Sequence, residues 1–264
     1  ISDTFRDMYL SDPQNRNAIL KYNYENLFIM NWSYQFVYNS RSLGNSAGNY
    51  GTNAYTIRLG IETAGNLLYG LSSASNMKRN VDNQYTLFGI AYAQYAKLDF
   101  SFCKSFLINK NNSFAMRAAF GIAAPYGNSD ILPYEKRYFS GGANSVRGWS
   151  VRELGPGSFI GNDGRIDFIN QTGDIKLDLN VEYRTHLFWK FDGAAFIDAG
   201  NIWTIRDYKE QPGGQFRIDE FWRQIAVSYG LGIRLNLGYF ILRFDGGMKA
   251  IHPSYKDHRK FPIV

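Results

Sequence analysis

A glycine-rich stretch near the middle of the chain, "YFSGGANSVRGWSVRELGPG" at residues 138–157, combines turn-forming, bulky and charged residues. Arg147 stands there between a valine and a glycine–tryptophan pair. A planar guanidinium binds carboxylates through several charge-assisted hydrogen bonds, so an arginine held in a confined space requires acidic partners. The simpler alternative is an arginine that is solvated on a surface loop.

The other residues with catalytic or metal-binding side chains form no recognisable constellation. No G-x-S-x-G elbow is present, and the only close histidine and serine lie in the C-terminal tail. His252, Asp257 and His258 contain metal-binding groups, but a solvated tail is the simpler interpretation. Asp163 and Asp167 lack the full pattern and the final glutamate of a calcium loop. We therefore expect no enzyme activity, no metal and no cofactor.

Composition narrows the class of protein further. The net charge is +6, but basic and acidic residues are interleaved, so no nucleic-acid-binding stripe is present. A single cysteine, Cys103, excludes an internal disulfide. No apolar run approaches the length of a membrane helix, although transmembrane β-barrels share this property and also have low mean hydropathy.

The elements that must position these residues are predicted by a strict alternation of apolar and polar residues, which is typical of β-strands with two different faces. In residues 174–187, Glu182 lies on the polar face, and Asp198 lies on the polar face of the segment 191–200. The alternation predicts about eight strands, including one unbroken strand over 86–106, and no helix of useful length.

The polar faces favour a membrane barrel over a soluble sandwich. They carry many glycine, alanine and serine residues beside the charges, as expected where side chains crowd into a lumen, and the apolar rows are long enough to cross a bilayer on a tilted strand. Short and long connections also alternate along the chain. We predict an antiparallel transmembrane β-barrel domain over residues 1–264, with one long connection at about 123–173.

That connection contains a recognisable signature. The sequence "LPYEKRYFSGGANSVRGWSVRELGPG" resembles the lid loop of the BamA/TamA superfamily of outer-membrane assembly barrels, and its wording is most similar to a TamA-like lipoprotein branch of Bacteroidetes-type bacteria. The core of the signature is followed by a tryptophan where the family usually has phenylalanine or tyrosine. The residues that carry the resemblance are Gly141, Gly142, Val146, Arg147, Gly148, Trp149 and Gly155.

The resemblance implies a latch. In the family, the loop folds back inside the barrel and its arginine meets acidic groups on the two strands that follow, which correspond here to Glu182 and Asp198. The alternative is that these two carboxylates are ordinary lumen charges, paired with Arg184 or Arg234.

The resemblance also implies sixteen strands, whereas about eight are predicted here. We therefore expect the chain to be a piece of a longer protein that holds approximately strands eight to fifteen of the barrel. Its edges at 28–38 and 239–249 would then lack partners within the chain.

The function implied by the resemblance is the insertion of unfolded outer-membrane proteins into the bacterial outer membrane. In the family, a client strand adds at a lateral seam by β-augmentation, without nucleotide. The implied partners are the lipid bilayer, unfolded client proteins, and periplasmic or inner-membrane assembly factors. The alternative function is a passive pore or protein-secretion channel, with the loop as a plug.

Overall fold

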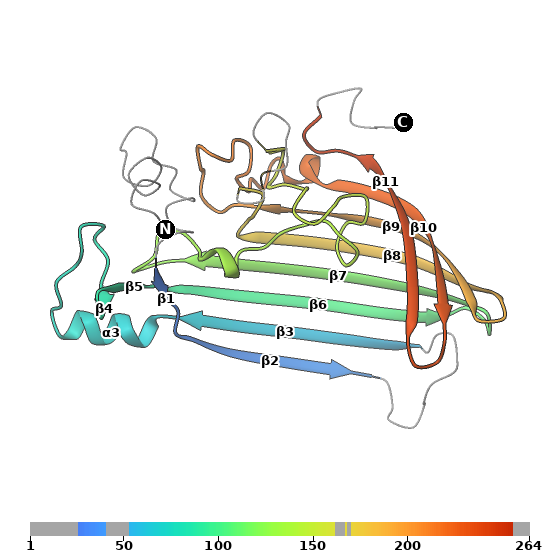
Figure 1. Cartoon of the computed structure of the whole chain (residues 1–264), viewed down its shortest axis with the longest axis horizontal. Coiled ribbons are helices and arrows are strands. Elements are labelled where there is room, and N and C mark those ends of the chain that lie inside the picture. Colours follow the sequence, from blue (N-terminus) through green and yellow to red (C-terminus); the bar gives the residue numbers. More distant parts are fainter. Residues whose placement is uncertain (1–25, 41–52, 162–166, 168–169, 256–264) are drawn as a thin grey trace.

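The computed structural model describes residues 26–40, 53–161, 167 and 170–255. Its main element is an eight-stranded sheet in which every neighbouring pair of strands is antiparallel (Figure 1). Strands adjacent in the sheet follow one another along the chain. In spatial order they are β2 (Asn31–Asn39), β3 (Ala54–Ala64), β6 (Tyr95–Leu107), β7 (Asn112–Pro125), β8 (Ile175–Phe188), β9 (Phe191–Trp203), β10 (Ala226–Asn236) and β11 (Ile241–Ile251).

The apolar face of the sheet is exposed, whereas part of its polar face is covered by other residues of the chain. On β9, Ile197 is 56% exposed, whereas the next residue, Asp198, is completely buried. Leu231 on β10 is 72% exposed, whereas its neighbours Gly230 and Gly232 lie on the opposite face. A water-soluble sheet has the reverse arrangement, because apolar area removed from water stabilises the fold. The outer face is therefore built for an apolar solvent.

Two predictions about secondary structure are wrong. A nine-residue helix, α3 (Asn66–Ala74), follows β3, although no helix was expected. The strand predicted over 86–106 is broken into β4 (Thr86–Leu87), β5 (Ile90–Tyr92) and β6, because Phe88 and Gly89 adopt positive φ angles and reverse the chain. Alternating residues predict a strand equally well on both sides of such a turn, so the pattern alone does not reveal the break.

The remaining small elements lie at one end of the sheet. β1 (Leu27–Phe28), β4 and β5 form a three-stranded sheet, and two 3₁₀ turns, η2 (Tyr134–Lys136) and η4 (Phe221–Gln224), interrupt the long connections. Among the described residues, no helix has both the length and the apolar character that crossing a membrane would require.

Short and long connections emerge at opposite ends of the strands (Figure 1). The turns at 108–111, 189–190 and 237–240 share one end, and the connections at 65–94, 126–174 and 204–225 share the other. The sheet is open, and its edges in the described part of the chain are β2 and β11, at the two places expected from the resemblance to a larger barrel. Short turns on one side and long loops on the other are typical of outer-membrane barrels.

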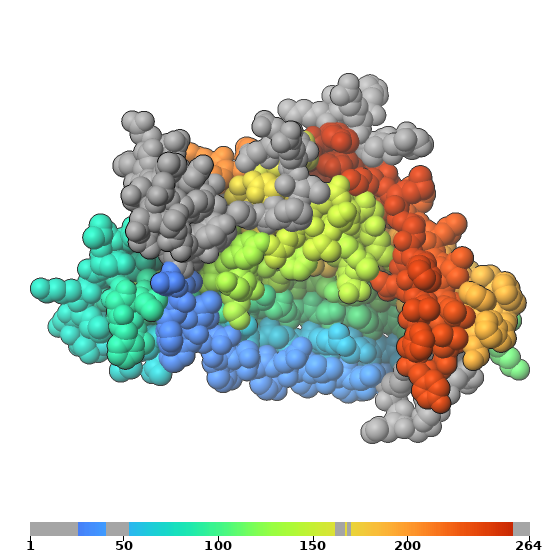
Figure 2. Space-filling view, in the orientation of Figure 1, coloured from blue at the N-terminus to red at the C-terminus, as the bar shows by residue number. Residues whose placement is uncertain are grey.

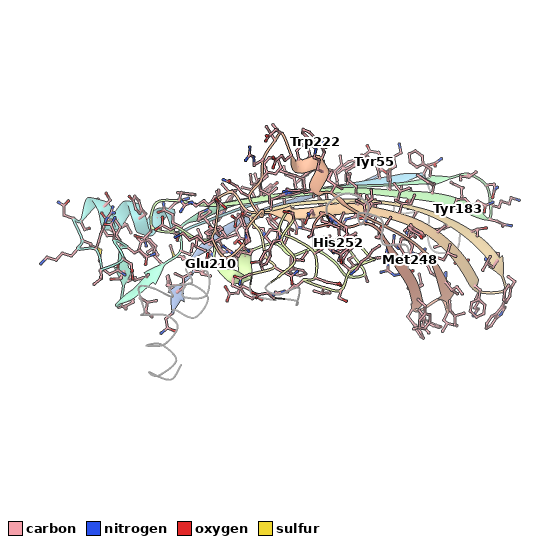
Figure 3. The ribbon with its side chains drawn as sticks, turned by 90° about the horizontal axis from the view of Figure 1, so that it is seen from above. Tyr55, Tyr183, Glu210, Trp222, Met248 and His252 are labelled. Atoms are coloured by element: carbon pink, nitrogen blue, oxygen red, sulfur yellow. The ribbon has the colours of Figure 1, made fainter. Side chains whose placement is uncertain are left out.

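The longest described connection, between β7 and β8, does not extend away from the strands. It lies along one side of the sheet: Figure 2 shows it in yellow-green, and Figure 3 shows the sheet nearly edge-on with the connection on one side. Besides residues 153–157, whose Glu153 pairs with Lys249 and whose Gly157 bonds to β9, two regions of it contact the sheet. We call residues 143–149 the tip, and residues 132–138 with 171–174 the base.

Candidate functional site

The tip is presented by a tight reversal of the chain. Gly141 and Gly142 have φ angles of +94° and +84°, a region that residues with a Cβ rarely adopt. The Gly142 N–H donates to the Trp149 carbonyl over 2.7 Å, which closes the loop around the tip. The glycine pair therefore allows a compact loop to project its side chains onto the sheet.

Arg147 is the central residue of the tip. Its Nε and Nη2 donate to the two carboxylate oxygens of Asp198 on β9, at 2.7 and 2.8 Å, and its backbone N–H also donates to Asp198. Its Nη1 is 2.8 Å from Glu182 on β8 and 3.2 Å from Asp245 on β11. The guanidinium lies 3.4 Å from the centre of the Phe196 ring, a cation–π contact. One side chain thus joins three strands of the sheet.

The cluster is buried, so these charges depend on one another. The side chains of Arg147, Glu182 and Asp245 are 7–8% exposed, and that of Asp198 is not exposed at all. Burial alone lowers the pKa of the Arg147 guanidinium, but hydrogen bonds to Asp198 and Glu182 outweigh it and raise the pKa, so the group remains charged. Removing one member of such a buried set leaves the charges of the others uncompensated.

The structure brings Arg147, Glu182 and Asp198 together, and it also pairs Glu182 as an ordinary lumen charge. The second oxygen of Glu182 lies 2.6 Å from Arg184 Nε and 2.6 Å from Arg234 Nη1. The two interpretations of Glu182 in the sequence are therefore compatible, because a carboxylate has two oxygens and enough lone pairs for several donors.

Sequence reasoning missed two partners of Arg147, namely Asp245 and Phe196. Asp245 lies on the polar side of the alternating segment that became β11, so its face was predictable. Its contact with Arg147 depends on the register between β11 and β10, in which Asp245 lies opposite Gly232. Phe196 is an apolar residue on the polar face of β9, and no charge pattern marks it.

The backbone of the tip lies close to the strands because glycines face it. A Cβ on Gly148 would lie 2.7 Å from Ser228 Cβ, and one on Gly247 would lie 2.6 Å from the Arg147 carbonyl oxygen. The Ser145 hydroxyl donates to Asp178 at 2.7 Å, which adds a polar contact to the strand β8. Close approach of the tip therefore depends on glycines on both partners.

Trp149 and Val146 are both buried at the end of the tip. The Trp149 ring contacts the His252 ring at 5.8 Å and lies under the Lys249 ammonium, 5.5 Å from it, while its indole N–H has no partner among the described residues. Burial, together with Lys249, lowers the pKa of His252 to about 4, so this ring is neutral at pH 7. Gly155 packs farther along, where a Cβ would lie 2.3 Å from Asn201.

The base contacts a different part of the sheet. Tyr138 and Gly173 exchange two 2.8 Å backbone hydrogen bonds, which bring the two arms of the connection together. The Tyr138 hydroxyl donates to Asp99 on β6 at 2.7 Å, and Lys136 pairs with Glu62 on β3 at 2.7 Å. Burial and the Asp99 carboxylate raise the pKa of Tyr138, so its hydroxyl stays protonated and donates.

The residues considered for metal or catalytic chemistry do not assemble in the part of the chain that the structure describes, where no group of three or more histidine, cysteine or acidic side chains could hold a metal. Asp163, Asp257 and His258 lie outside the described residues. His252 belongs to the aromatic contact with Trp149, and His186 lies 3.0 Å from Asp192.

Long antiparallel strands with an exposed apolar face, short turns at one end and a connection packed on the polar face define a segment of an outer-membrane β-barrel. The chain belongs to the Omp85 superfamily, whose domain matches residues 10–263. The resemblance to the BamA/TamA superfamily and the outer-membrane location are thereby confirmed. The TamA-like branch stays a prediction.

Individual relatives are distant. A stretch of 114 residues is 27% identical to the outer membrane protein assembly factor BamA of Neisseria meningitidis serogroup B, over 40% of this chain and 13% of that protein. Among solved structures, BamA from Haemophilus ducreyi lacking POTRA domains 1–3 is similar with a TM-score of 0.48 and 14% identity, over 84% of this chain and 51% of that one. CdiB from Acinetobacter baumannii is similar with a TM-score of 0.39 and 18% identity, over 88% and 41%. The chain therefore spans about half the length, or less, of these relatives.

Proposed function

We propose that this chain is part of an outer-membrane barrel that inserts unfolded outer-membrane proteins into the bilayer, and that the β7–β8 connection is its lid. Membership in the Omp85 superfamily supports a role in protein assembly or secretion in general. The similarity to a protein named as an assembly factor favours assembly. The observation that carries the specific proposal is the bonding of one tip arginine to carboxylates on β8, β9 and β11.

The chemistry of the latch is electrostatic and needs no cofactor and no catalytic step. Arg147 keeps its full set of partners only while β8, β9 and β11 hold their present positions. A change in the curvature or register of these strands would leave a buried charge without a partner, which is costly. The docking of the lid and the arrangement of the strands are therefore linked, so that either one biases the other. The partners in this proposal are unfolded client proteins, the lipid bilayer, and periplasmic or inner-membrane assembly factors.

The test measures client folding in liposomes that contain the full-length protein. Arg147→Ala and Glu182→Ala are each expected to slow client assembly about tenfold or more, while the barrel still forms, as judged by its heat-dependent electrophoretic mobility. Arg217→Ala is the control, because this exposed arginine pairs, among the described residues, with Asp219 and Glu220 alone, both in the 204–225 connection. Full activity of both Arg147→Ala and Glu182→Ala would contradict the proposal.

A passive pore or secretion channel is the second candidate function. The polar face of the sheet carries charged side chains such as Arg58, Arg117 and Lys176, as expected for the wall of an aqueous channel. Planar-bilayer recording separates the two functions. A steady open conductance without any client favours the pore, whereas a closed barrel favours the lidded insertase.

A further inference from the structure

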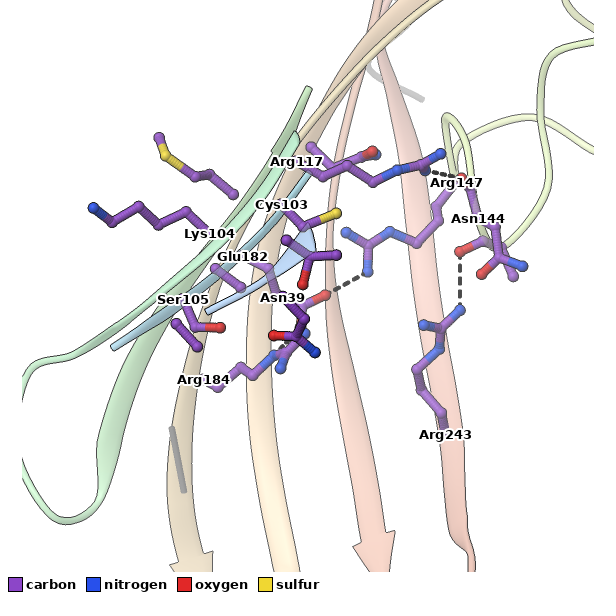
Figure 4. A pocket seen from close by; sticks show the side chains of 16 residues that line it. Asn39, Cys103, Lys104, Ser105, Arg117, Asn144, Arg147, Glu182, Arg184 and Arg243 are labelled. Atoms are coloured by element: carbon purple, nitrogen blue, oxygen red, sulfur yellow. Dashed lines mark hydrogen bonds and ion pairs between the residues drawn. The ribbon is translucent and has the colours of Figure 1, made fainter. Parts of the chain in front are cut away.

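A cavity of about 390 Å³ lies beside the tip on the polar face of the sheet, and arginines from three strands line it (Figure 4). Arg117 comes from β7, Arg184 from β8 and Arg243 from β11. We call these three residues and the space between them the arginine pocket. Other lining residues, such as Thr56 and Ser105, are small and polar, so the pocket suits a hydrophilic occupant.

Positive charge exceeds negative charge around this pocket. The carboxylates of the cluster are already shared: Glu182 serves three arginines, and Asp245 serves Arg147 and Arg243. No carboxylate of a described residue pairs with Arg117. Together, the arginine pocket and the ion-pair cluster around Arg147 contain five guanidinium groups and three carboxylates. The guanidinium groups are those of Arg117, Arg147, Arg184, Arg234 and Arg243, and the carboxylates are those of Glu182, Asp198 and Asp245.

Two of the pocket arginines bind the tip through neutral acceptors. Arg117 Nη1 donates to the carbonyl oxygen of Asn144 at 2.6 Å, and Arg243 Nη2 donates to that of Ala143 at 2.9 Å. A carboxylate is a stronger acceptor for a guanidinium than a peptide carbonyl, because both partners are charged. An anion that enters the pocket can therefore replace the tip carbonyls as the partner of these arginines.

The position of the pocket indicates a polypeptide as the source of that anion. The pocket lies toward the short-turn end of the strands: Arg243 is near the start of β11, and Arg184 is near the end of β8. It opens on the polar face, opposite the apolar face that lipid tails would cover. Arg184 is half exposed there, with 48% of its side chain accessible. In outer-membrane barrels, short turns face the periplasm, the side from which an unfolded protein would enter.

We propose that the arginine pocket binds the carboxylate side chains of an acidic polypeptide segment, and that this binding loosens the tip by displacing the carbonyls of Ala143 and Asn144. The proposal deepens the proposed function and rests on it only for the identity of the polypeptide as a client. The site itself follows from the excess positive charge, the cavity and the neutral acceptors on the tip.

The experiment measures binding of a short fluorescent peptide of alternating aspartate and serine to the full-length protein in detergent micelles. The matched asparagine–serine peptide is expected to bind with an affinity at least about tenfold lower. Arg184→Gln and Arg243→Gln are each expected to weaken binding of the acidic peptide by about tenfold. Arg58→Gln removes the same charge from the polar face outside this pocket and is expected to change binding by less than about twofold. Hydrogen exchange at residues 143–146 is expected to rise when the acidic peptide binds.

Several results would overturn the proposal. Equal binding of the two peptides, or equal loss in Arg58→Gln and Arg184→Gln, would show only diffuse attraction between charges. Arginine-dependent binding of glycerol phosphate but not of the acidic peptide would identify a lipid headgroup as the ligand instead. The peptide-binding assay involves no client assembly, so failure of this inference can be distinguished from failure of the proposed function. Absent peptide binding with slow assembly in Arg147→Ala removes only this inference, and peptide binding with full assembly in Arg147→Ala removes only the proposed function.

Discussion

The tip and the base of the β7–β8 connection are held on the same sheet in different ways. At the tip, one arginine with 7% of its side chain exposed serves carboxylates from three strands. The base is held by several separate contacts, in which a tyrosine hydroxyl bonds Asp99, a lysine pairs with Glu62, and backbone groups of Tyr138 and Gly173 pair with each other. At the tip, the bonds to carboxylates thus converge on one buried arginine, whereas the bonds of the base are spread over Tyr138, Lys136 and the backbone, with Lys97 contacting both the Tyr138 ring and the Lys136 carbonyl.

The difference predicts which region can be released. Without Arg147, Glu182 would keep its other two arginines and Asp245 would keep Arg243, but the buried Asp198 would lose the only cation paired with it among the described residues, which is costly. Bonds that share no atoms are lost one at a time, and each is worth little alone. A connection built in this way can release its tip while its base stays attached.

The largest expected effect comes from Arg147→Ala. The tip should lose about 3–5 kcal/mol of docking free energy, because the carboxylates of Glu182, Asp198 and Asp245 lose a shared buried cation. Hydrogen exchange at residues 143–149 should accelerate strongly, and exchange at 136–138 should change little. Arg147→Lys should accelerate exchange at the tip less than Arg147→Ala does, since an ammonium keeps the charge but not the planar fork. Equal acceleration in both regions would show that the tip and the base are one unit.

An intermediate effect is expected from Gly247→Ala. The added Cβ would lie 2.6 Å from the Arg147 carbonyl oxygen, so the tip must move away from β11 at a cost of about 1–3 kcal/mol. The neighbouring Gly246→Ala is the matched control, because the nearest atom to its Cβ would be the Leu231 carbonyl oxygen at 3.9 Å. Protease protection of the tip should fall only in the first variant. Similar protection in both variants would contradict the close approach.

The smallest effect is expected from Tyr138→Phe at the base. This change removes one hydrogen bond to Asp99, whose side chain is half exposed and can bind water instead, so the expected cost is about 1 kcal/mol. The Lys136–Glu62 pair and the backbone bonds to Gly173 remain. Exchange at 136–138 should therefore rise slightly. A loss as large as that of Arg147→Ala would mean that the base also depends on one residue.

Much of the sheet follows from local pattern. The alternation of residues in 174–187 and 191–200 predicted which face of each strand is polar, and β8 and β9 have those faces in the structure. The same rule missed the turn at Phe88–Gly89 and the helix α3, because a short element carries too few periods to be recognised. Phe196 was missed because its role is to lie under a guanidinium that comes from elsewhere in the chain.

The sequence by itself determined the faces of the strands, the glycine pair that turns the connection, and the type of partner that Arg147 needs. The family resemblance pointed to Glu182 and Asp198, but only the tertiary structure added Asp245 on a third strand. Asp198 lies opposite Asn180 on β8 and Ser228 on β10, and Asp245 lies opposite Gly232, so strand register alone brings two aspartates from different strands within reach of one guanidinium. Register is a property of paired strands, because a shift of two residues preserves every face and moves every partner.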